Sequence, residues 1–183
     1  MPDQSQTMTL EAFADTIIPG EKRWPDDRAI AGISEGGGAV AAGAIAVLNT
    51  EAGGLAPALP DLAAALNNHA TTYASEHDLV LDDTVPPFVA LESPDRIALV
   101  GKLCSWECPE RQIWVNLAVF SNMAFDTAGH MSTTEALAQG HPGLLATGFR
   151  KPDTDGLWRF PVHSYGRQLA QHHPDTTPSG SPA

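Results

Sequence analysis

Residues 110–131 read ERQIWVNLAVFSNMAFDTAGHM, and this stretch decides the fold class. Between Trp114 and Phe120 it is apolar nearly all round, which is typical of a helix at the centre of a protein. Across the whole stretch, apolar side chains recur at the three- and four-residue spacing of an α-helix. They are Ile113, Leu117, Phe120, Ala124 and Met131. We therefore predict a long, almost wholly buried central helix in an all-α fold.

Helix start and stop signals surround this central stretch. Ser93-Pro94-Asp95 places a capping residue, a proline and an acid at the start of one helix, and Pro60-Asp61 begins another. Thr9 can cap a first helix that Pro19-Gly20 ends, and Ser132 or Thr133 caps a last one. The predicted helices span residues 9–18, 39–49, 60–77, 94–107, 110–128 and 132–139.

The predicted architecture is a single-domain helical bundle with an irregular C-terminal extension rich in aromatic residues, glycine and proline. Residues 1–140 form the helical core domain. Residues 141–170 form the extension, which packs on the core or on a partner, and residues 171–183 form a disordered polar tail. Residues 21–38 are predicted as an irregular connection, in which the triplet Gly36-Gly37-Gly38 supplies an unusual backbone path rather than a phosphate site.

The composition bears on the classes of partner. The 183 residues contain 22 acidic and 10 basic side chains, a net charge of −12. No Lys/Arg cluster occurs, which argues against nucleic acid and against an anionic membrane surface. No apolar run reaches the length of a membrane span, and the N-terminus has no basic, apolar or twin-arginine export pattern. We therefore expect a cytoplasmic protein.

Three residues are weak candidates for catalysis. Asp126 and His130 lie four apart on the predicted long helix, and His141 follows after the next turn. Such a group could bind a metal or act as an acid/base pair. The simpler interpretation is a histidine at a helix end paired with an aspartate, because such pairs are routine on helices. We assign no catalytic or metal-binding residue on this basis.

Other potentially reactive side chains are also interpreted as structural. Cys104 and Cys108 are interpreted as buried free thiols, with a redox or metal role and a disulfide as alternatives. His69 is predicted to be a core or boundary residue beside an apolar stripe. No dinucleotide-binding fingerprint follows a strand, so we expect no flavin or other cofactor in this chain.

The extension carries the residue types that dominate protein interfaces, Trp, Tyr and Arg. Its rings could also cover their own domain. We predict a partner interface formed by Phe149, Arg150, Trp158, Arg159, Phe160 and Tyr165.

Both ends of the sequence resemble a known family. The N-terminal TLEAFADTIIPG (residues 9–20), followed after Pro25 by residues 29–33, AIAGI, is similar to the start of the gluconate 2-dehydrogenase subunit 3 family. Residues 155–161, DGLWRFP, with Tyr165-Gly166, look like the C-terminal element of that family. The middle of the chain matches only by its helical pattern.

The resemblance implies a small, non-catalytic helical subunit that wraps on a larger flavin-dependent oxidoreductase of the glucose-methanol-choline (GMC) type. The large subunit carries the FAD and the chemistry, and the small one supports its folding, stability or export. Many members of that family carry a twin-arginine export signal, which this sequence lacks. In this respect, and in its acidic, lysine-poor composition, the sequence resembles a cytoplasmic variant of the family found beside genes for secondary metabolites such as aromatic polyketides. Two alternatives remain: a stand-alone small-molecule enzyme using Asp126 and His130, and a scaffold module without an oxidoreductase partner.

Overall fold

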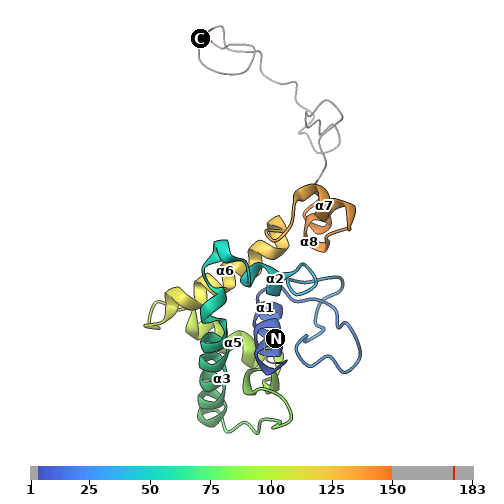
Figure 1. The fold of residues 1–183 in the computed structure, drawn as a ribbon. Helices are drawn as coiled ribbons and strands as arrows, with labels where there is room; N and C mark the ends of the chain where they lie inside the picture. The colour runs from blue at the N-terminus through green and yellow to red at the C-terminus, as the bar shows by residue number, and fades with distance from the viewer. Residues whose placement is uncertain (1–3, 150–174, 176–183) are drawn as a thin grey trace. The chain divides into compact units, whose positions relative to one another are not determined.

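A computed structural model of the chain describes residues 4–149 and Asp175 (Figure 1). Within these residues the regular structure is entirely helical, which confirms the predicted all-α fold. None of the helices described there is long and apolar enough to cross a membrane. In chain order the elements are α1 (Gln4–Ile17), α2 (Ala44–Leu48), the 3-10 helices η1 (Glu51–Gly53) and η2 (Ala56–Ala58), α3 (Leu59–Glu76), α4 (Pro87–Ala90), α5 (Ser93–Leu103), α6 (Arg111–Thr127), α7 (Thr133–Ala138) and α8 (Pro142–Ala146).

The α6 helix is the central helix of the bundle, as the sequence predicts. It contacts α1, α2, α5 and α8. The Phe13 ring of α1 lies between the rings of Phe88 in α4 and Trp114 in α6, at centroid distances of 6.5 and 6.4 Å. These three side chains are almost completely buried, so one aromatic cluster joins the N-terminal helix to the middle of the chain.

One face of α6 is nevertheless exposed, and the prediction of an almost wholly buried helix is wrong. Its buried stripe consists of Trp114, Leu117, Ser121 and Ala124. Ile113, which was expected in the core, is 45% exposed. The apolar pattern runs nearly all round the helix, so the sequence alone does not indicate which arc the neighbouring helices cover.

Several helix ends differ from the predictions. Helix α1 begins at Gln4, so Thr9 is buried within it and its hydroxyl donates to the Ser5 carbonyl at 2.9 Å instead of capping. Only residues 44–48 of the predicted helix 39–49 are α-helical. Ser132 does cap α7, where its side chain accepts a hydrogen bond from the Glu135 amide at 3.3 Å. Ser93, the predicted capping residue of the next helix, is instead the first residue of α5, and Glu92 occupies the N-cap position.

The buried face of α5 is set by Arg96. This side chain is 5% exposed, and its guanidinium donates to four main-chain carbonyls, those of Arg28, Ala29, Val89 and Leu91. Leu99, Val100 and Leu103 share its buried face, whereas Ile97 is 52% exposed. On this helix a charged residue thus takes an inward position that apolar periodicity would assign to an apolar side chain.

The irregular connection, predicted for residues 21–38, spans residues 18–43 in the structure, and Asp15 fastens it to α1. The buried Asp15 carboxylate accepts hydrogen bonds from the amides of Gly20 at 3.0 Å and Ala31 at 2.8 Å. Gly38 packs its backbone against that of Gly20 so closely that no Cβ would fit. Gly38 thus permits a close backbone approach, and Gly36 adopts a left-handed φ of 78°, in agreement with the unusual backbone path predicted for the triplet. Asp15 also joins the two N-terminal segments that carry the family resemblance.

The helical domain extends past the predicted boundary at residue 140. Gly140 adopts a left-handed φ of 70° and closes α7, and α8 then begins at Pro142. Leu144 of α8 packs with Ala128 and Ala136 in a small apolar cluster. Residues 141–149 consequently belong to the packed domain rather than to an irregular extension.

Candidate functional site

The predicted pairing of Asp126 with His130 does not form. Helix α6 ends at Thr127, and Ala128 then takes a left-handed φ of 50°, so His130 lies outside the helix that carries Asp126. Asp126 is exposed and accepts a hydrogen bond from Asn122. The premise that both side chains share one helix face is therefore wrong.

His141 has a structural role. Its side chain is 5% exposed, and its Nδ1 accepts a hydrogen bond from the Leu144 amide at 3.3 Å, which caps α8. Because Nδ1 accepts, Nε2 carries the proton and donates to the Ala42 carbonyl at 3.0 Å. Both ring nitrogens are thus occupied, and neither is available to a metal or a substrate.

His130 lies beside His141, with a ring centroid distance of 6.2 Å. Its ring packs on Gly43, where a Cβ atom would collide with it. Burial, together with the neighbouring His141, lowers the pKa of His130. The two histidines border a cavity of about 140 Å³. Residues 4–149 and Asp175 contain no group of three side chains suited to hold a metal ion.

Cys104 and Cys108 are free thiols, as predicted, but they are half-buried rather than buried; this partial burial raises the pKa of the Cys104 thiol. His69 is a boundary residue, also as predicted, and lies 2.9 Å from the Glu110 carboxylate.

A candidate interaction surface lies on α6. From Gln112 to Phe125 this helix has no charged residue, although the chain carries a net charge of −12. Its exposed side holds Ile113, Val119 and Met123, which are 45, 49 and 37% exposed. We call these three residues the outer face of α6.

A second exposed feature, the aromatic residue Trp106, lies beside Arg111 at the start of α6. Its side chain is 84% exposed, and the Arg111 guanidinium lies 3.8 Å from its ring centroid. A tryptophan stacked with an arginine combines the two residue types most common at interface hot spots. Sequence reasoning missed the outer face of α6, although the absence of charge between Gln112 and Phe125 could have indicated it.

Of the predicted interface residues, Phe149 lies in the described part of the chain. It packs against the cluster of Ala128, Ala136 and Leu144, and its amide donates to the Leu144 carbonyl at 2.9 Å. Phe149 therefore anchors the end of its own domain. The other predicted interface residues, Arg150, Trp158, Arg159, Phe160 and Tyr165, lie outside the described residues.

A family model described as "Family of unknown function (DUF5987)" matches residues 4–183. No curated protein and no solved structure matches the chain.

Proposed function

The chain belongs to the family of unknown function DUF5987, and from that premise we propose that it is a non-catalytic accessory subunit of a larger partner protein. The partner is a cytoplasmic flavin-dependent oxidoreductase of the GMC type, which carries the FAD and the chemistry of a secondary-metabolite pathway. The choice of partner rests on the resemblance of residues 9–20 and 155–161 to gluconate 2-dehydrogenase subunit 3.

The outer face of α6 is the observation that carries the proposal. A patch of exposed apolar side chains often marks an interaction site, whereas apolar residues scattered singly over a surface do not. No charge lies between Gln112 and Phe125, so a partner that covers this stretch desolvates no ionised group within it, and the exposed Asp126 lies at its C-terminal edge. Charged residues are likewise depleted at the cores of protein interfaces.

The position of α6 also suits binding. Trp114 and Leu117 of the same helix are 1 and 0% exposed, so the core holds α6, and with it the outer face, in place. A rigid surface loses little conformational entropy on association. The stand-alone enzyme has no comparable support, because His141 uses both ring nitrogens within the fold and Asp126 binds Asn122.

Co-purification tests the proposal. The tagged protein, isolated from its native cells, should bring down a larger polypeptide that shows flavin absorbance. Met123→Glu places a carboxylate within the proposed contact and should weaken the complex at least about tenfold, or about 1.4 kcal/mol. The matched control is Val80→Glu, at a residue that is 98% exposed and lies outside α6. The control should retain the partner.

Melting curves of the isolated variants exclude unfolding as the cause of any loss. The proposal fails if the isolated protein brings down no flavoprotein. The assignment to α6 fails if Met123→Glu and Val80→Glu retain the flavoprotein equally well.

A further inference from the structure

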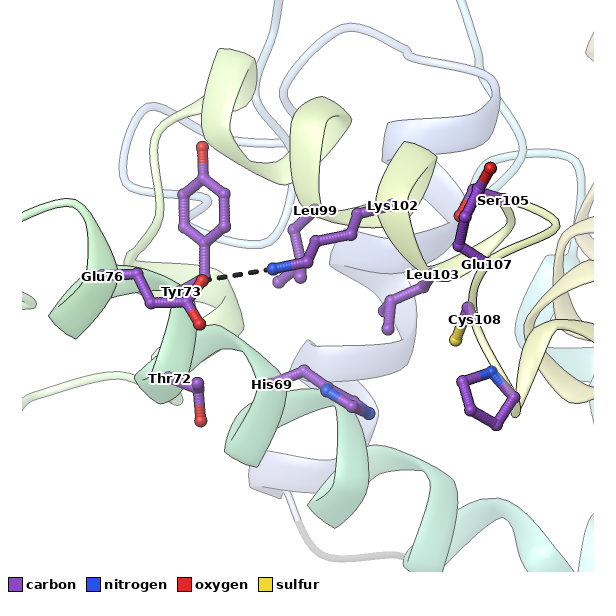
Figure 2. Close-up of a pocket in the computed structure, with 11 residues that line it drawn as sticks. His69, Thr72, Tyr73, Glu76, Leu99, Lys102, Leu103, Ser105, Glu107 and Cys108 are labelled. Atoms are coloured by element: carbon purple, nitrogen blue, oxygen red, sulfur yellow. Dashed lines mark hydrogen bonds and ion pairs between the residues drawn. The ribbon is translucent and has the colours of Figure 1, made fainter.

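A pocket of about 240 Å³ opens between α3, α5 and the turn that leads to α6 (Figure 2). Its floor is apolar and formed by Leu99 and Leu103 of α5, which are 2 and 3% exposed, with Pro109 from the turn. Such a concave apolar floor is the usual base of a small-molecule site.

Fixed side chains form the wall on the α3 side. The Tyr73 hydroxyl donates to the Asp95 carboxylate at 3.1 Å, and the His77 ring stacks on the Tyr73 ring at 4.2 Å. His69 meets the buried Trp114 ring edge-on at 5.7 Å. The pocket is therefore preformed, and a ligand would not have to order its walls.

The rim of the pocket is polar and acidic. Lys102 of α5 reaches across to Glu76 of α3 with a separation of 3.1 Å, the dashed line in Figure 2. Both side chains of this pair are at least half exposed, so the pair can open at small cost. Glu107 faces the pocket from the turn, and a hydrogen bond from Ser105 lowers the pKa of its carboxyl. The rim thus has two carboxylates and one ammonium group.

We infer that this pocket binds a small one- or two-ring compound that carries a positively charged amine. The volume lies below the roughly 300–1,000 Å³ of pockets for drug-sized ligands, which limits the ligand to one or two rings. The rings cover Leu99 and Leu103, and the amine pairs with Glu76 or Glu107. An anionic compound of the same shape could pair with Lys102 but meets the same two carboxylates, so the net charge of the rim disfavours it. The inference does not depend on the proposed partner.

A matched pair of probes tests the charge preference. Naphthylethylammonium and naphthylacetate share one ring system and differ in the sign of their charge. In titrations followed by nuclear magnetic resonance with the full chain, the amine should bind at least about tenfold more tightly, a difference of about 1.4 kcal/mol. Glu107→Gln should weaken binding of naphthylethylammonium and reduce the ratio of its affinity to that of naphthylacetate.

Two neighbouring threonines test the location. Thr71 and Thr72 are both exposed on α3, and each donates its hydroxyl to the carbonyl four residues earlier. Only Thr72 lines the pocket. Thr72→Phe should fill the mouth and abolish binding of naphthylethylammonium, whereas Thr71→Phe should leave it unchanged. The inference is overturned if the amine does not bind saturably, if both probes bind alike, or if binding survives Thr72→Phe.

Discussion

Gly143 of α8 lies directly against the main-chain carbonyl of Phe125 in α6, and a Cβ atom added to Gly143 would overlap that oxygen. The short helix α8 therefore packs on the backbone of the central helix rather than on its side chains. Gly143 is buried, so the side chain of any other residue could not turn away into solvent. This contact fastens residues 142–146 to the bundle.

Gly143→Ala should destabilise the protein by about 1–3 kcal/mol, because the methyl group forces α8 away from α6. Gly101→Ala is the matched control, since Gly101 is an exposed helical residue and an added Cβ would meet nothing within 4 Å beyond its neighbours and the backbone of its own helix. It should stabilise the protein by about 0.5–1 kcal/mol through the better helix propensity of alanine. Urea unfolding of both variants measures the two effects. Equal stability of the two variants would contradict the packing described.

Arg96→Met should lower the free energy of unfolding far more than the loss of a surface charge does. It removes the donor from four main-chain carbonyls, and each buried group left unpaired costs about 1–3 kcal/mol. We expect a loss of at least about 3 kcal/mol, measured by urea unfolding. The control is Arg111→Met, where the guanidinium stacks on the exposed Trp106. If the two variants unfold at the same urea concentration, the carbonyl contacts of Arg96 contribute little.

His130 should make stability depend on pH. Burial, with His141 as the second cause, lowers the pKa of His130 in the folded state below the ordinary value of 6.5. The unfolded chain then takes up the proton more readily than the folded chain. The stabilisation is complete above pH 6.5 and is lost as the pH falls through that value toward the folded-state pKa. His130→Gln should flatten this part of the melting-temperature profile, and parallel profiles for the two proteins would refute the assignment.

The fold class was predictable because long periodic segments dominate it. Helix α3 carries clear proline and acid signals and begins within one residue of its predicted start. The short helices α4 and α8 were not predicted, because tertiary contacts rather than local signals fix them. In α8 these contacts are the packing of Gly143 on α6 and the hydrogen bond of His141 to the Ala42 carbonyl.

The candidate sites were harder to predict, for two physical reasons. Spacing placed Asp126 and His130 four residues apart, but the left-handed Ala128 ends the helix between them. The buried position of Arg96 depends on four carbonyls from distant segments, and no local pattern encodes that arrangement. The pocket lined by Lys102 could not be predicted either, because it forms only where α3 and α5 pack side by side.

Trp158 gives a second test of partner binding, independent of α6. The segment around it combines glycine, proline and aspartate with large rings whose burial is strongly favourable. Arg150 and Arg159 could reach carboxylates on a partner and orient the contact. Trp158→Ala should weaken assembly by about 2 kcal/mol or more if the ring is a central anchor. The measurement is co-purification of the flavoprotein with wild type and variant, beside a melting curve of each isolated chain. A variant that melts earlier alone, yet retains its partner as wild type does, would assign Trp158 to the core of its own chain.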